Sequence, residues 1–216
     1  MHLDILSDPI CPWCYIGKAH LDRALAERPD HGLEIRWHPF QLNPTMPREG
    51  MDRRAYLEAK FGAEPAARFY AQIAEAARAA GLEVDFERIG RTPSTLDAHR
   101  LIHWAGLEGC QSAVVDRLFR AYFAEGRDIG RAEELIAIAG EVGMDREMVR
   151  RLLASDADVE EIRFRDAWAR EKGVDGVPTF IIADRYVARG AQPHTLWLKV
   201  IDELRAQIET GDGGAA

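Results

Sequence analysis

One short motif constrains the fold of this chain more than any other feature: the Cys-Pro-Trp-Cys sequence of residues 11–14. It follows a run with strand character, residues 3–7, and opens a helical run that extends to residue 27. Two thiols separated by two residues at such a turn lie close enough to form a disulfide reversibly. We therefore expect a two-electron redox site at the start of the first helix.

The two cysteines are expected to have different roles. Cys11 fits the helix N-cap, because this places Pro12 at the first helical position, where its missing N–H is harmless. There the Cys11 sulfur would face unpaired N–H groups and the positive end of the helix dipole, which favour a nucleophilic thiolate. Cys14, one turn later and covered by packing, suits the resolving role. Trp13 is either a structural choice or an exposed apolar contact for a substrate.

The remaining pattern predicts an α/β frame around a helical block. An alternating run at 33–37 predicts a second strand, parallel to the first because a helix joins them, and ended by the two prolines of 38–44. A strand at 177–182 and another at 185–188 predict an antiparallel hairpin, followed by a helix at 193–208. An extended loop is expected at 82–86. Helical patterns recur in between, at 53–61, 64–80, 95–105, 112–124, 132–142, 146–154 and 157–171.

The composition argues against several kinds of partner. A formal net charge of −8 and a pI near 5.4 leave no concentrated basic surface for nucleic acid or an anionic membrane. No apolar run approaches a membrane span, and the chain enters its first strand without a secretion signal, so we expect a cytoplasmic protein. Only 3 cysteines are present, unlike a scaffold stapled by disulfides.

No metal site is predicted. A closed zinc site needs two ligands besides Cys11 and Cys14, and no second Cys-x-x-Cys is present. His99 and His103 lie one helical turn apart without the glutamate of a His-Glu-x-x-His motif, so we interpret them as partly buried helix residues. Cys110 stands alone in a helical context and is interpreted as buried or incidental.

The predicted order βαβ, helical insertion, ββα, with Cys-x-x-Cys at the first helix and Val-Pro before the third strand, resembles the thioredoxin fold of the DsbA family. The resemblance covers nearly the whole chain. It divides the chain into a thioredoxin-like domain, 1–45 and 173–210, a helical insertion domain, 46–172, and a tail, 211–216, expected to be disordered. Within that family, the sequence looks most like the FrnE-like branch at 7–18, 39–44 (Pro-Phe-Gln-Leu-Asn-Pro), 176–180 (Gly-Val-Pro-Thr-Phe) and 190–193.

The resemblance implies a substrate site beside the thiols. Pro178 would be cis and lie against the Cys11 sulfur, while Val177 would offer its backbone to an extended peptide or to glutathione. Pro12 and Trp13 would complete the substrate contacts on the first helical turn.

Two positions depart from the family pattern. Ile5 occupies the strand position at which thioredoxin and DsbA itself carry a buried acid, so the usual proton acceptor for Cys14 is missing. Asp8 is nearer and could substitute, although we favour a turn-capping role for it. Ser94 stands where the FrnE-like pattern has asparagine, which puts in question what this loop contributes to substrate binding. For His20 and His38 we favour surface or packing roles over proton transfer.

These observations favour a cytoplasmic thiol-disulfide oxidoreductase that exchanges disulfides with protein or glutathione thiols and needs no metal or organic cofactor. Glutathione, as a co-substrate, or another dithiol system would reset the cysteine pair. The main alternative is a glutathione-dependent isomerase or transferase, similar to the 2-hydroxychromene-2-carboxylate isomerases and kappa-class glutathione transferases. In those relatives a serine commonly replaces the first cysteine and the second is absent, so both thiols favour redox chemistry. A further alternative is a peptide-binding chaperone.

Overall fold

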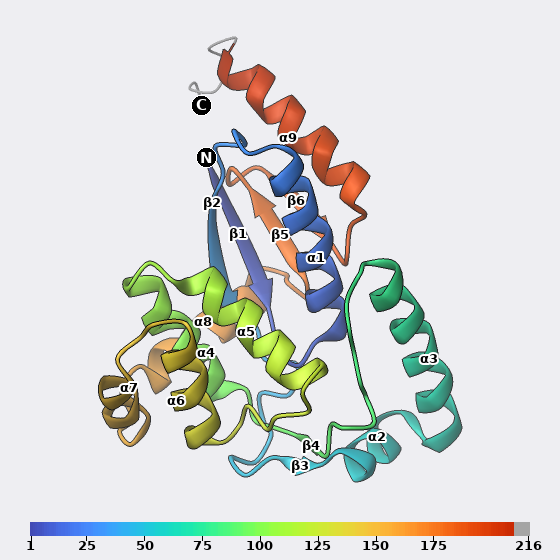
Figure 1. Ribbon diagram of the computed structural model, residues 1–216, viewed down its shortest axis with the longest axis vertical. Helices are drawn as coiled ribbons and strands as arrows, with labels where there is room; N and C mark the ends of the chain where they lie inside the picture. The colour runs from blue at the N-terminus through green and yellow to red at the C-terminus, as the bar shows by residue number, and fades with distance from the viewer. Residues whose placement is uncertain (210–216) are drawn as a thin grey trace.

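A computed structural model describes residues 1–209, apart from the side chains of 63–67, 69, 208 and 209. Its centre is a four-stranded sheet in the order β2-β1-β5-β6 (Figure 1). The strands are β1 (His2–Ser7), β2 (Glu34–Pro39), β5 (Thr179–Ile182) and β6 (Tyr186–Arg189). β1 runs parallel to β2 and antiparallel to β5, and β5 pairs antiparallel with β6, so the predicted βαβ unit and hairpin are confirmed. The sheet thus joins the two ends of the chain through β1.

Two helices pack side by side over one face of the sheet, α1 (Pro12–Glu27) and α9 (His194–Glu209) (Figure 1). They meet the sheet through apolar side chains, including Phe180 of β5, whose ring lies 4.7 Å from that of Trp197. Gly17 allows α1 to approach β5 closely, because a Cβ there would lie 3.2 Å from Cγ of Pro178. This packing brings the start of α1 against the start of β5.

Between β2 and β5 the chain is helical, as expected. The helices are α2 (Arg53–Phe61), α3 (Ala63–Ala79), α4 (Leu96–Leu107), α5 (Gln111–Phe123), α6 (Ala132–Glu141), α7 (Arg146–Leu153) and α8 (Val159–Glu171). The sequence pattern missed one feature, a two-stranded ladder between β3 (Met51–Asp52) and β4 (Arg91–Thr92), because strands this short have no periodicity to detect. The extended loop at 82–86 contains no strand.

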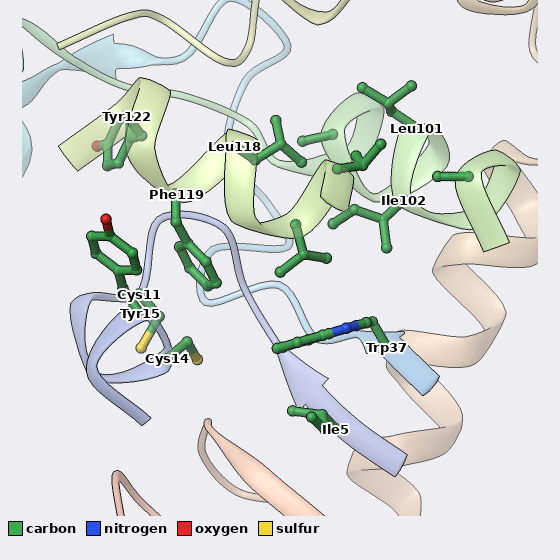
Figure 2. Packing of buried hydrophobic residues seen from close by; sticks show 14 of the residues in the cluster. Ile5, Cys11, Cys14, Tyr15, Trp37, Leu101, Ile102, Leu118, Phe119 and Tyr122 are labelled. Atoms are coloured by element: carbon green, nitrogen blue, oxygen red, sulfur yellow. The ribbon is translucent and has the colours of Figure 1, made fainter. Parts of the chain in front are cut away.

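The inserted helices share a hydrophobic core with the sheet. Figure 2 shows Ile5 of β1 and Trp37 of β2 in one cluster with Leu101 of α4 and Phe119 of α5. Polar contacts add to this packing, since the Trp37 N–H groups donate to Gln111 and Ser112 of α5. The division into a thioredoxin-like domain and an insertion domain stays a prediction, and the tail at 211–216 lies outside the described residues.

The second strand is longer than predicted. We expected the prolines after residue 37 to end it, but β2 continues to Pro39, which pairs with Ser7. The prediction was wrong because β2 has only β1 as a neighbour in the described sheet, so the missing N–H of Pro39 breaks no ladder on its outer edge.

A buried arginine fastens the turn between α7 and α8 to α4. The guanidinium of Arg100, with 0% of the residue exposed, donates to the carbonyl oxygens of Leu152, Ser155 and Ala157 at 2.6, 2.8 and 2.7 Å. Its charge is balanced by Asp97, whose Oδ1 lies 2.7 Å away. One side chain therefore donates to three carbonyl groups, one in the last turn of α7 and two in the segment that follows it.

Candidate active site

The Cys-x-x-Cys motif begins α1 as the sequence predicts. Cys11 is the N-cap with an extended backbone, and Pro12 occupies the first helical turn. The turn before it is closed by the Cys11 N–H, which donates to the Asp8 carbonyl at 2.9 Å, and by the Cys14 N–H, which donates to the Cys11 carbonyl at 3.1 Å. Strand, turn and cap thus fix both thiols at the end of β1.

The Cys11 sulfur points somewhere other than expected. We expected it to face the N–H groups of the first turn, but the cap makes no side-chain hydrogen bond to them. The thiol instead donates to the Val177 carbonyl, with 3.6 Å between sulfur and oxygen. The reason is tertiary: β5 follows the Val177–Pro178 bond, which is cis, and its pairing with β1 brings this segment to the thiol.

Both cysteines are free thiols and both are buried, Cys11 with 4% and Cys14 with 1% of the residue exposed. Burial raises the pKa of Cys14 well above its ordinary value, and the adjacent Cys11 sulfur raises it further. The Ser7 hydroxyl and the Asp8 backbone N–H oppose this rise because both lie against the Cys14 sulfur. Cys14 is therefore a protonated thiol at neutral pH and must lose its proton before it can attack a disulfide.

Helix α3 packs over part of the motif, which bears on the two interpretations of Trp13 that the sequence left open, a structural choice or an exposed substrate contact. Pro12 and Trp13 are only partly exposed. Trp13 packs with Tyr70 against a small cluster formed by Ile16 of α1 and by Ile73 and Ala77 of α3. The apolar face of α3 was visible in the sequence, but its partner was not.

Asp8 is the residue near the thiols whose environment was hardest to predict from the sequence. It is completely buried, with 0% exposed, and its carboxylate accepts N–H bonds from Leu42 at 2.7 Å and Ile10 at 3.3 Å, which confirms the predicted turn-capping role. Burial raises the pKa of Asp8 to about 7, against the lowering effect of donors from Leu42, Ile10 and Thr95. A carboxyl that titrates near neutral pH therefore lies in the turn that leads from β1 to the cysteines. At the position of the missing acid, Ile5 is a core residue with 1% exposed.

Asp8 should make the stability of the protein depend on pH. Its carboxyl ionises near pH 3.8 when unfolded and near 7 when folded, so between these values the folded state binds more protons. Raising the pH from 4 to 8 should then lower the unfolding free energy, relative to Asp8→Asn, by about 4 kcal/mol. The variant keeps an oxygen acceptor for Leu42 but cannot ionise. Urea unfolding of both proteins at several pH values measures this difference.

The comparison between the two proteins is needed because His99 acts in the opposite direction. Burial lowers its pKa to about 3 in the folded state, from an ordinary value of 6.5, so stability gained from neutral His99 is lost as the pH falls. Because His99 is present in both proteins, its contribution cancels. A difference in unfolding free energy that stays constant from pH 4 to 8 would contradict the assignment of the raised pKa to Asp8.

The other residues singled out from the sequence do not join the thiols in this arrangement. His38 is held between Asp4, with 2.6 Å from Nε2 to Oδ1, and Arg165, with 2.8 Å to Nδ1, and burial lowers its pKa. Cys110 is the N-cap of α5 and is partly exposed. In residues 1–209, no group of three or more His, Cys, Asp or Glu side chains is placed to hold a metal ion. Within the same range no helix has both the length and the apolar character to span a membrane.

Known proteins share the fold that holds this site. Residues 2–202 match the family described as DSBA-like thioredoxin domain. A probable DsbA oxidoreductase from Streptomyces coelicolor is 33% identical, with a TM-score of 0.85 over 96% of this chain and 91% of that one. Two structures at 22% identity share the fold: 2-hydroxychromene-2-carboxylate isomerase (TM-score 0.71, 100% of both chains) and the cytosolic disulfide reductase DsbM from Pseudomonas aeruginosa, solved with glutathione (TM-score 0.65, 98% of both). The chain therefore belongs to the DSBA-like thioredoxin domain family, in which it resembles the FrnE-like branch of thiol oxidoreductases.

Proposed function

We propose that this protein is a thiol-disulfide oxidoreductase in which Cys11 attacks the substrate and Cys14 resolves the resulting mixed disulfide. One observation carries the proposal: the Cys11 sulfur lies 3.6 Å from the Val177 carbonyl oxygen, while Cys14 lies one helical turn further along α1 with 1% of the residue exposed. The thiol nearer the substrate segment is the one suited to attack, and the enclosed thiol is the one suited to resolve.

Val177 and Pro178 would position the substrate. In the free dithiol the Val177 carbonyl accepts the Cys11 thiol. Once Cys11 has formed a bond to a substrate sulfur, it has no proton to donate, and the carbonyl becomes free to accept an N–H from an extended peptide or from glutathione. Pro12 and Trp13 flank the sulfur on the first turn of α1 and would add apolar contacts.

Glutathione is proposed as co-substrate, with no metal or organic cofactor. Its presence in the DsbM structure supports this choice only by analogy of fold. The same neighbour is named as cytosolic, which is consistent with our proposal of a cytoplasmic location for this chain. The substrates would be disulfides or thiols of proteins or small molecules.

The glutathione-dependent isomerase remains the alternative function, because the isomerase structure has the same fold. Isomerisation with glutathione does not need a resolving thiol, whereas this chain places a second thiol directly behind the first. The peptide-binding chaperone would be favoured if suppression of aggregation survived replacement of both cysteines by serine.

A redox titration in glutathione buffers tests the proposal. Thiol trapping and the fluorescence of Trp13 should report one reversible two-electron transition, with a midpoint between about −270 and about −120 mV, the potentials of thioredoxin and DsbA. Cys110→Ser is the matched control and should titrate like the wild type, because Cys110 lies outside the motif. A pair that stays reduced in every buffer, or that stops at a stable glutathione adduct, would favour the isomerase.

A further inference from the structure

Resting on the proposed function, the geometry points to a proton acceptor that replaces the acid missing at Ile5. We propose that the Asp8 carboxylate takes the proton of the Cys14 thiol in the resolving step, by way of the small polar cavity that Ser7 and His99 line. Asp8 thus joins its turn-capping role to a chemical one.

The first argument is the position of this segment beneath the thiols. Ser7 ends β1 and Asp8 begins the turn that leads to the motif. The Asp8 carbonyl accepts the Cys11 N–H at 2.9 Å, and the Asp8 N–H and the Ser7 hydroxyl both lie against the Cys14 sulfur. The same two residues therefore contact the backbone of the nucleophile and the sulfur of the resolving thiol.

The second argument is the surroundings of the carboxylate. It accepts hydrogen bonds from Leu42, Ile10 and Thr95, yet among the described residues no lysine or arginine nitrogen lies within 4.0 Å of it. Asp166 of α8, itself 4% exposed, adds a like charge. Complete burial raises the pKa of Asp8 to about 7, because the hydrogen-bond donors offset only part of the cost of burying the charge and no cation is beside it. The group can therefore accept and return a proton near neutral pH.

The third argument is a set of unsatisfied polar atoms in the same place. Ser7 Oγ and His99 Nε2 are buried without any hydrogen-bond partner among the described residues, and His99 Nε2 lies 4.0 Å from Asp8 Oδ1. Both side chains line one cavity of about 10 Å³, together with Pro9 and Trp37. A space of this size with polar walls accommodates about one water molecule. Polar atoms therefore extend from the Cys14 sulfur to the vicinity of the carboxylate.

The charged groups that face Asp8 come from several elements. α4 contributes His99, whose pKa of about 3 keeps it neutral, and α8 contributes Asp166 and, beyond His99, Arg165. α5 contributes Tyr122, whose pKa is raised by burial and further by Asp8. Burial raises the pKa of Asp8 to about 7. Asp8 is therefore the group expected to set the pH dependence of the resolving step.

The step balances as follows. In the mixed disulfide, Cys11 is bonded to a substrate sulfur and Cys14 is a thiol. The Cys14 proton passes to the Asp8 carboxylate, and the sulfur electron pair forms the bond to Cys11. The bond between Cys11 and the substrate breaks, and the substrate leaves as a thiolate. The substrate disulfide is reduced by two electrons, and the cysteine pair is oxidised by two.

The two thiolate releases can be separated with dithiobis(nitrobenzoate), whose released thiolate is coloured. Every protein in this test carries Cys110→Ser, because the partly exposed third thiol would also release a coloured thiolate. In single-turnover mixing with the reduced full-length protein, the first release then reports attack by Cys11 and the second reports resolution by Cys14. In the otherwise wild-type protein the second rate should rise with pH and level off above about 7. In Asp8→Asn it should fall by about 10²-fold at pH 7 and lose this inflection, while the first rate changes little.

Two further variants serve as a matched control and as a second test of the proton route. Asp166→Asn is the matched control, since Asp166 is another buried carboxylate that accepts a backbone N–H, from Gln41 at 2.8 Å. It should keep the second release and move its inflection to lower pH, because a like charge beside Asp8 is removed. Ser7→Ala leaves the hydrogen bonds of the Asp8 carboxylate in place and should slow the second release about tenfold. This variant decides the question if Asp8→Asn does not fold.

The outcomes separate the two proposals. If Asp8→Asn, or Ser7→Ala in its place, keeps the wild-type second rate and pH profile, Asp8 is a turn cap only and the inference is overturned. The same holds if both releases slow equally, since that indicates a general structural effect. A wild type that releases a single thiolate overturns the proposed function itself, and the inference with it.

Discussion

Serine in place of Cys11 should abolish disulfide exchange, whereas serine in place of Cys14 should allow the reaction to start but not to finish. Cys11 is the thiol that contacts Val177, and a hydroxyl there cannot attack a disulfide under the same conditions. In glutathione-coupled reduction of a protein disulfide, Cys11→Ser should lose at least about 10³-fold in turnover. Cys14→Ser should lose a similar factor, because the resolving thiol is gone and glutathione has to reach the mixed disulfide on the buried Cys11 from solution.

Intact-mass measurement distinguishes the two variants. After exposure to oxidised glutathione, Cys14→Ser should carry one glutathione on Cys11, and Cys11→Ser should carry none at the buried Cys14, which has 1% of its surface exposed. Cys110→Ser is the control for the third thiol and should turn over like the wild type. Full turnover by Cys11→Ser would refute the assignment of the nucleophile.

The largest effect on stability is expected from Arg100→Met, which keeps the length of the side chain and removes its donors and charge. Three carbonyl groups, of Leu152, Ser155 and Ala157, lose their charged partner, and Asp97 loses the closer of its two cationic partners and keeps Arg48 at 3.6 Å. Breaking a buried, hydrogen-bonded ion pair by removing one partner costs about 3–5 kcal/mol. The free energy of unfolding in urea, followed by circular dichroism, should fall by this amount.

Arg163→Met is the matched control for this substitution. Arg163 also belongs to the helical block and also pairs with a carboxylate, Glu160 at 2.9 Å, but its side chain is 59% exposed. Exposed pairs contribute little because water competes for both charges. The control should therefore unfold at nearly the wild-type urea concentration. Equal effects of the two substitutions would mean that the turn between α7 and α8 does not depend on Arg100.

The sequence predicted the elements in which a regular apolar pattern extends over many residues, and those marked by a fixed motif. The helices of the inserted segment, the hairpin of β5 and β6 and the N-cap position of Cys11 all follow from local patterns. The extension of β2 to Pro39 was missed, since whether a proline can remain in a strand depends on which edge of the sheet it faces. The ladder of β3 and β4 was missed because it is too short to have a pattern.

The surroundings of the site were harder to predict than its residues. That Val177 lies beside Cys11 came from a resemblance, because the two residues are 166 positions apart. The environment of Asp8 depends on Leu42, Thr95 and Asp166, which three separate segments bring to one place. The packing of α3 over Trp13 likewise depends on segments that are far apart in the sequence. A pKa near 7 for a carboxyl is a property of such an assembly, and no local pattern predicts it.

The distance along the chain between Cys11 and Val177 has a consequence for synthesis. The two cysteines leave the ribosome while the 166 positions up to Val177 are still to be made, including every inserted helix. At about 5–20 residues per second this takes roughly 10 to 30 s. Until the end of that interval the thiols do not have the Val177 carbonyl beside them. The nascent protein therefore meets the oxidants and thiols of its compartment before it can control its own reactivity.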